Sequence, residues 1–76
     1  MAHRIQISAE LIPEPKEGGY TAYCPEFDVA SQGDDPDDAI KNLKEALFGY
    51  IKTIGIREAF KSYRHPIREI IELHIA

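Results

Sequence analysis

Apolar and polar residues alternate along the first part of the chain, from Arg4 to Ile12. A period of two is typical of a half-buried β-strand, in which successive side chains point to opposite faces. The apolar side consists of Ile5, Ile7, Ala9 and Leu11. Because Pro13 and Pro15 follow directly, we expect this strand to end at Ile12.

Two shorter segments, Tyr20–Cys24 and Asp28–Gln32, also predict strands. Gly18 and Gly19 precede the first of them and can adopt the positive φ angles that a hairpin requires, so the strands on either side should pair antiparallel. Pro25 lacks an N–H group and should interrupt the pairing between the two segments. The front of the chain therefore predicts a three-stranded antiparallel meander.

The spacing of the apolar residues changes to 3.6 after Pro36, which predicts a long amphipathic helix that continues to Ile54. Asp35 is placed to cap the first free N–H groups, and Gly55 is a natural helix terminator. The apolar stripe comprises Ala39, Ile40, Leu43, Ala46, Leu47, Tyr50, Ile51 and Ile54. We expect this stripe and the apolar face of the sheet to form the core.

The remaining residues predict a short helix over 56–64, ended by Pro66, and a final strand over 67–75. In that last segment Ile71, Leu73 and Ile75 alternate with polar residues. The predicted fold is thus α+β, with the order β-β-β-α-β, in one domain spanning residues 1–76.

Composition and charge narrow the function. A hydrophobic fraction of 43% and a charged fraction of 29% are those of a folded domain, not of a disordered chain. The net charge of -4 hides a division, because residues 1–38 carry two bases against nine acids, whereas residues 39–76 carry seven bases against four acids. An acidic front half disfavours the binding of nucleic acid, whereas it can attract a basic protein. The alternative is that these charges only keep the surface soluble.

Cys24 is the only cysteine of the sequence, which excludes an internal disulfide and a cysteine-based zinc site. The start of the chain, MAHRIQIS, lacks the apolar region of a signal peptide, and no apolar run is long enough for a membrane span. We expect a cytoplasmic protein.

The sequence offers little for catalysis. Glu10, Glu26 and Asp28 could form a carboxylate cluster if the first and third strands brought them together, but each also fits a polar strand face or a turn. The three histidines show no metal-ligand spacing with one another or with Cys24. We expect neither a catalytic residue nor a metal or cofactor.

Aromatic residues gather near the end of the second strand. Tyr20, Tyr23 and Phe27 could stack nucleic-acid bases, yet the surrounding segment has no arginine or lysine to hold a phosphate backbone. Contact with another protein and simple core packing both remain open for them.

One long stretch, from Ile12 to about Ile51, resembles a known family. It holds an acidic loop with paired glycines, an aromatic strand, a Cys-Pro-Glu-hydrophobic corner, the run DVASQGD, and a PDDA helix start followed by NLKEAL. This order of motifs is similar to the signature of the HicB antitoxin family.

The resemblance implies a fold like a truncated ribonuclease H and self-association as a homodimer or homotetramer. It further implies a partner, a small basic HicA-type toxin that cleaves messenger RNA and that the antitoxin neutralises. Longer members add a DNA-binding segment, and because this chain ends at Ala76 we expect no DNA binding by this short form.

We expect the contact surface for the toxin to lie at the turn where the second strand ends. Its residues are Tyr23, Pro25, Glu26, Phe27 and Asp28. The alternative functions are an orphan oligomeric domain with a structural or small-ligand-binding role, and a residual metal-dependent nuclease.

Overall fold

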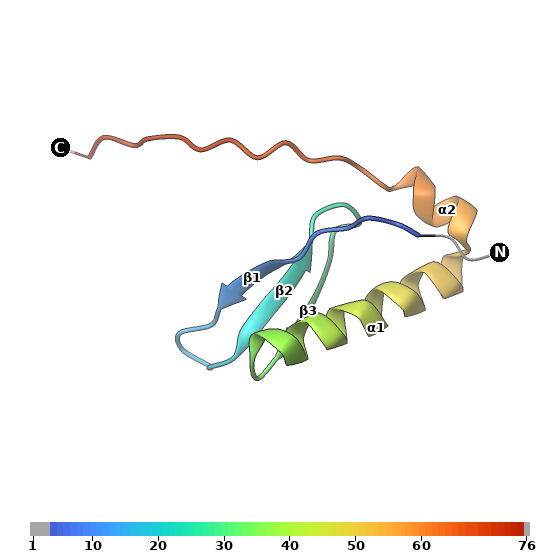
Figure 1. Cartoon of the computed structure of the whole chain (residues 1–76), viewed down its shortest axis with the longest axis horizontal. Coiled ribbons are helices and arrows are strands. Elements are labelled where there is room, and N and C mark those ends of the chain that lie inside the picture. The colour runs from blue at the N-terminus through green and yellow to red at the C-terminus, as the bar shows by residue number, and fades with distance from the viewer. Residues whose placement is uncertain (1–3, 76) are drawn as a thin grey trace.

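The computed structural model describes residues 4–75 and shows a small sheet with one long helix across it (Figure 1). This arrangement is α+β, as the sequence predicts. The elements in chain order are β1 (Glu10–Pro13), β2 (Tyr20–Cys24), β3 (Val29–Gly33), α1 (Pro36–Ile54) and α2 (Ile56–Lys61).

The three strands form an antiparallel sheet in the order β1-β2-β3, so the predicted meander is confirmed. In the hairpin turn, Gly18 donates from its N–H to the carbonyl of Glu14 at 2.8 Å. Gly18 and Gly19 both have positive φ angles, of 79° and 78°. Because only glycine adopts such angles without strain, these two residues fix the turn.

Helix α1 begins and ends where its flanking residues require. The Asp35 side chain accepts a hydrogen bond from the N–H of Asp38 at 2.8 Å, which caps one of the free donors at the helix start. At the other end Gly55, with φ at 88°, donates to the carbonyl of Ile51 at 2.8 Å. The predicted bounds of this helix are confirmed.

The core is small and lies between α1 and the strands β2 and β3. The buried residues are Ala22, Cys24, Phe27, Ala39, Leu43, Leu47 and Ala59. Gly33 at the end of β3 lets this strand lie against the start of α1, because a Cβ atom on residue 33 would clash with the backbone nitrogen of Ala39. Ala22 and Cys24 on β2 and Ala39 on α1 are small side chains, so α1 lies close to the sheet and little apolar volume is buried between them.

The first strand is shorter than the predicted segment, since residues 4–9 are extended but lie outside the sheet. Glu10 already pairs with Tyr23, and the next residue of β2, Cys24, is the last before Pro25 turns the chain away. Residues 4–9 therefore have no opposing strand. Ile7 stays 40% exposed and Leu11 38% exposed, so the predicted apolar side of this strand is only partly buried.

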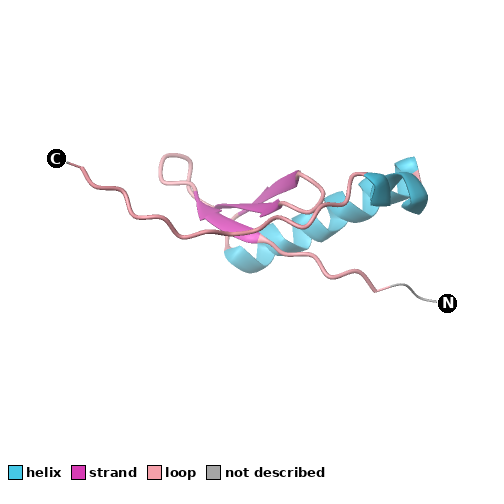
Figure 2. Ribbon diagram, turned by 90° about the horizontal axis from the view of Figure 1, so that it is seen from above, coloured by secondary structure: helices cyan, strands magenta, loops and turns pink. Residues whose placement is uncertain are grey.

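The predicted final strand over residues 67–75 is wrong for this structure. The segment is extended, but it makes no backbone hydrogen bond within the described part of the chain. It passes over the face of the sheet opposite α1, where Arg68 meets Glu10, and then runs beyond the end of the sheet (Figure 1 and Figure 2). A segment above a face cannot join the ladder at an edge, so a fourth strand does not form.

Two smaller differences have local causes. Strand β3 begins at Val29 and not at Asp28, because Asp28 has a φ of 57°, in the left-handed region that a strand excludes. The short helix α2 ends at Lys61, where Ser62 caps it, so it is shorter than predicted. Over residues 4–75, none of the helices has the length and apolarity to cross a membrane.

Candidate interaction site

The predicted contact residues lie at the end of β2 and in the turn that joins β2 to β3. We call this group the corner; it consists of Tyr23, Pro25, Glu26, Phe27 and Asp28. The Tyr23 hydroxyl donates to Asp28 Oδ1 at 2.7 Å and so bridges the turn. This hydrogen bond, with the Asp28 carboxylate beside it, raises the pKa of the Tyr23 phenol above its usual value.

Arg64, from the segment after α2, reaches back to the corner. Its backbone N–H donates to the carbonyl of Glu26 at 3.0 Å, and its Nε donates to the carbonyl of Pro25 at 2.9 Å. The guanidinium also lies 3.7 Å from Asp28 Oδ1. One arginine therefore satisfies two turn carbonyls and offsets one carboxylate.

Glu26 is held by the chain before β1. Its carboxylate accepts from the N–H of Ser8 at 2.9 Å and from the Ser8 hydroxyl at 2.7 Å. Desolvation opposes ionisation of this carboxyl, but the hydrogen bonds from Ser8 outweigh it and lower the pKa of Glu26 below its usual value. Glu26 is thus a structural anion that ties residues 4–9 to the corner.

Cys24 and Phe27 point inward from the corner. Phe27 is only 5% exposed, and its ring makes edge contacts with Tyr63 at 5.2 Å and Tyr50 at 6.2 Å between centroids. Burial raises the pKa of the Cys24 thiol, which keeps this side chain protonated and unreactive near neutral pH. Phe27 therefore serves the core, whereas Tyr23 and Asp28 present polar atoms at the surface.

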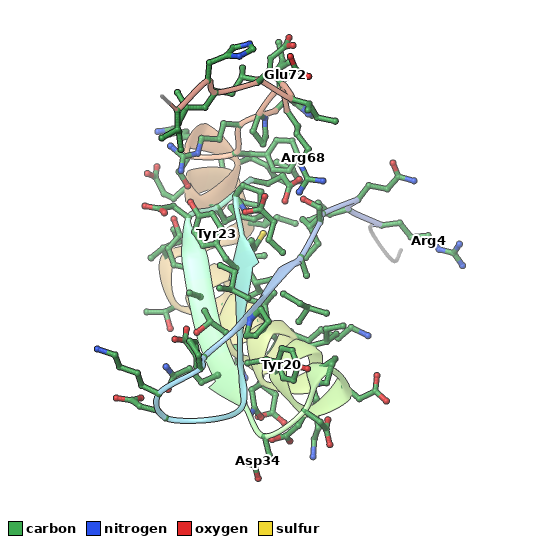
Figure 3. The ribbon with its side chains drawn as sticks, turned by 90° about the vertical axis from the view of Figure 1, so that its left-hand side faces the viewer. Arg4, Tyr20, Tyr23, Asp34, Arg68 and Glu72 are labelled. Carbon is green, nitrogen blue, oxygen red and sulfur yellow. The ribbon has the colours of Figure 1, made fainter. Side chains whose placement is uncertain are left out.

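A second group of acids lies where the β1–β2 turn meets the start of α1. We call it the acidic end; it consists of Glu14, Glu17, Asp34, Asp35, Asp37 and Asp38. A hollow of about 360 Å³ opens there, lined in part by Glu14, Glu17, Asp34 and Asp38. Figure 3 shows that Asp34 and Tyr20, which also lines the hollow, lie toward one end of the molecule, with Tyr23 toward the other.

The acids at the corner and those of the acidic end differ in whether a basic side chain lies beside them. At the corner, Asp28 faces Arg64, and nearby Glu10 meets Arg68 at 3.1 Å. Among residues 4–75, no member of the acidic end forms a salt bridge. Its hydrogen bonds go to uncharged donors, such as the Thr21 hydroxyl, which donates to Glu14 at 2.6 Å. Within residues 4–75, no lysine or arginine is therefore paired with the negative charge of the acidic end.

The structure does not bring the three candidate catalytic carboxylates into one site. Glu10 and Glu26 line one hollow, where they bond to Arg68 and Ser8, but Asp28 does not line it and bonds to Tyr23. Within residues 4–75, no three His, Cys, Asp or Glu side chains are grouped so that they could hold a metal ion. His65 packs against Tyr63 and His74 lies 4.0 Å from Glu72, while His3 falls outside the described residues.

Two parts of this site have no direct signal in the sequence. The hollow depends on Glu14 and Glu17 meeting the start of α1, which only the hairpin register brings about. The run DDPDD is visible in the sequence, but there it indicates a helix cap. Arg64 is 39 residues from the carbonyl that it binds, and no local pattern marks such a contact.

We compared the chain with protein families, with curated proteins and with solved structures. No family model, no curated protein and no solved structure matches it.

Proposed function

We propose that this chain is a non-catalytic, antitoxin-like binding protein that neutralises a small basic messenger-RNA-cleaving toxin of the HicA type. The observation that carries the proposal is the acidic end, where four of six carboxylates line a hollow and none of the six has a salt-bridge partner among residues 4–75. Lysine and arginine side chains of a basic partner are the complement of such a surface.

Electrostatics explains why such a surface would suit this task. A ribonuclease must bind a polyanion, so its RNA-binding face carries positive charge. An acidic surface attracts that same face over about a Debye length and speeds the encounter. A protein bound there would occupy the surface that the RNA needs.

The sequence signature supports the same proposal. The motifs that resemble HicB antitoxins include the acidic loop with Gly18 and Gly19 and the helix start with Asp35. In the structure, these two motifs frame the hollow of the acidic end. The corner is the second proposed contact surface, where Tyr23 and Asp28 offer polar atoms beside Arg64.

Co-expression with a short basic ribonuclease encoded next to this chain tests the proposal. We expect the two proteins to co-purify at low salt, to separate as the salt concentration rises, and to relieve the growth arrest caused by the ribonuclease alone. Separate elution at low salt, with growth arrest unchanged, would refute the proposed function.

Charge reversals locate the surface. Glu17→Lys and Asp34→Lys change exposed acids whose side chains make no hydrogen bond in residues 4–75, so the fold should persist. We expect each to weaken the complex on the order of tenfold. Glu45→Lys on the exposed side of α1 makes the same charge change and should leave affinity within about twofold. If Tyr23→Ala weakened the complex and Glu17→Lys did not, the contact surface would be the corner and not the acidic end.

A further inference from the structure

Residues 67–75, which we call the arm, expose every large apolar side chain that they contain. The exposed fractions lie between 80% and 94% for Ile67, Ile70, Ile71, Leu73 and Ile75. Single exposed apolar residues are common on protein surfaces, but four of these five, all except Ile70, share one side of the extended arm and form a strip. Such a strip is typical of a segment that is buried by another molecule.

The same chain carries an unpaired sheet edge. Strand β1 lies at the outside of the sheet, and residues 4–9 run on from it without a strand partner. On the α1 side of this edge, Ile7 is 40% exposed and Leu11 38% exposed. An exposed edge with apolar side chains is a template for an added strand.

We propose that the arm of one copy pairs antiparallel with residues 4–12 of a second copy, and that the exchange is reciprocal in a two-fold dimer. The register places Arg68 opposite Glu10 of the other copy. On the α1 side it then places Ile67 opposite Leu11, Ile71 opposite Ile7, and Leu73 opposite Ile5. These are apolar cross-strand pairs, which stabilise a sheet. The alternation of the arm is interrupted only at Glu69 and Ile70, which fall opposite Ala9 and Ser8.

The arm cannot make this pairing with its own chain. Tyr63 bonds to Gln6 and Arg68 to Glu10, so the arm runs in the same direction as β1. A parallel pairing with Arg68 beside Glu10 would place Glu72 near Glu14 and Glu69 near Leu11. Like charges and a carboxylate against a leucine disfavour that arrangement. The antiparallel register avoids both, because Glu69 then falls opposite the exposed Ala9.

The hollow beside the edge and the number of residues in the proposed interface also fit a second copy of the chain. A hollow of about 630 Å³ separates the start of the arm from the chain before β1, lined by Ser8, Ala9, Ile67 and Arg68 among others. An incoming strand would reach the edge of residues 4–12 from this side. Residues 4–13 and 67–75 supply nineteen residues a side, close to the roughly 20–30 of a standard interface.

Sedimentation equilibrium of the purified 76-residue chain, without any partner, tests the proposal. We expect a species of twice the chain mass of 8.6 kDa. Ile71→Lys should raise the dissociation constant of the dimer roughly 100-fold, because each copy contributes the substituted residue once. Ile70→Lys, one residue away on the opposite side of the arm, should change it by less than about tenfold. A monomer at all concentrations, or equal effects of the two substitutions, would overturn the proposal.

A charge exchange distinguishes pairing between copies from pairing within one. Arg68→Glu and Glu10→Arg each place like charges opposite one another in both halves of the dimer, and each protein alone should be mainly monomeric. Their mixture should form a heterodimer, because both facing pairs are then of opposite charge. Failure of the mixture to associate would overturn the exchange.

A disulfide test fixes the register. In a chain that carries both Ile7→Cys and Ile71→Cys, oxidation should give a covalent dimer on a non-reducing gel. The chain with Ile7→Cys and Ile70→Cys should give little of it, because those side chains point to opposite faces. A monomer whose two cysteines are joined within the chain would refute the pairing. None of these results depends on the toxin, so the antitoxin function can fail while the exchange stands.

Discussion

Arg64 Nε donates to the carbonyl oxygen of Pro25 at 2.9 Å, and this contact joins the segment after α2 to the turn between β2 and β3. The neighbouring backbone bond, from the N–H of Arg64 to the carbonyl of Glu26, is 3.0 Å long. Two hydrogen bonds from one residue thus hold the start of the C-terminal segment over the sheet.

Replacement of Arg64 by alanine should therefore cost a small but measurable part of the stability. The side chain is exposed, so solvent screens its charge and we expect a loss of about 0.5–1 kcal/mol in the free energy of unfolding. Urea denaturation followed by circular dichroism measures it. Arg57→Ala, in α2, is the matched control, because the Arg57 side chain makes no hydrogen bond within residues 4–75. Equal losses in both variants would contradict a specific role of Arg64.

Leu47→Ala should destabilise the protein strongly. Leu47 is buried between α1 and the sheet, and truncation of a core leucine costs about 2–5 kcal/mol. The adjacent Phe48 is 69% exposed, so Phe48→Ala serves as the control and should cost well under about 1 kcal/mol in the monomer. Chemical denaturation measures the free energy of unfolding of both variants. A larger loss for Phe48→Ala than for Leu47→Ala would mean that the buried face of α1 is assigned wrongly.

Two glycines should respond oppositely to alanine. Gly33→Ala introduces a Cβ against the backbone of Ala39, and overpacking of this kind costs about 1–3 kcal/mol or more. Gly49→Ala lies within α1 with open space around it, and alanine favours a helix interior by about 0.5–1 kcal/mol. Thermal denaturation should show a lower midpoint for the first variant and a higher one for the second. A Gly33→Ala protein as stable as the parent would show that β3 and α1 are farther apart than described.

Acid should weaken the fold partly through Glu26. The hydrogen bonds from Ser8 lower the pKa of this carboxyl in the folded state below its ordinary 4.5. The contribution to stability is therefore complete above that value and is lost as the pH falls through the lower, folded-state pKa. As the pH falls below about 4.5, the free energy of unfolding should fall less steeply in Glu26→Gln than in the parent. Identical slopes would contradict the role of this carboxylate.

The elements that the sequence predicts best are those whose signals are local. Asp35 and Gly55 mark the two ends of α1, and Gly18 and Gly19 mark the hairpin turn, so the helix and the strand pairing follow from residues within a few positions. The buried side of β2, with Ala22 and Cys24, also follows from its period of two.

The two outer segments show where such patterns fail. Residues 4–9 and 71–75 alternate as strands do, but alternation indicates only which side chains share a face. Whether a ladder forms depends on a partner of sufficient length, and β2 ends too early to provide one for residues 4–9. Apolar alternation without a partner in the same chain is itself the observation that points to a second copy.

The candidate site was predictable only in part. The acids of the DDPDD run and the turn at Pro25 are evident in the sequence, and so is the excess of negative charge. The hollow at the acidic end and the arginine at the corner arise from contacts between distant segments. The inward position of Phe27 is likewise a tertiary effect, because Tyr50 and Tyr63 come from α1 and from the segment after α2.

Gly55 alone joins α1 to α2, and its left-handed backbone sets the angle between the two helices. Nothing lies within 4 Å of where its side chain would be, so the choice of glycine reflects backbone angle and not crowding. The backbone angle of Gly55 therefore sets the direction in which α2 and the segment after it leave α1. A different backbone angle at this joint would change the direction of α2 and would strain the two hydrogen bonds by which Arg64 holds the following segment over the sheet.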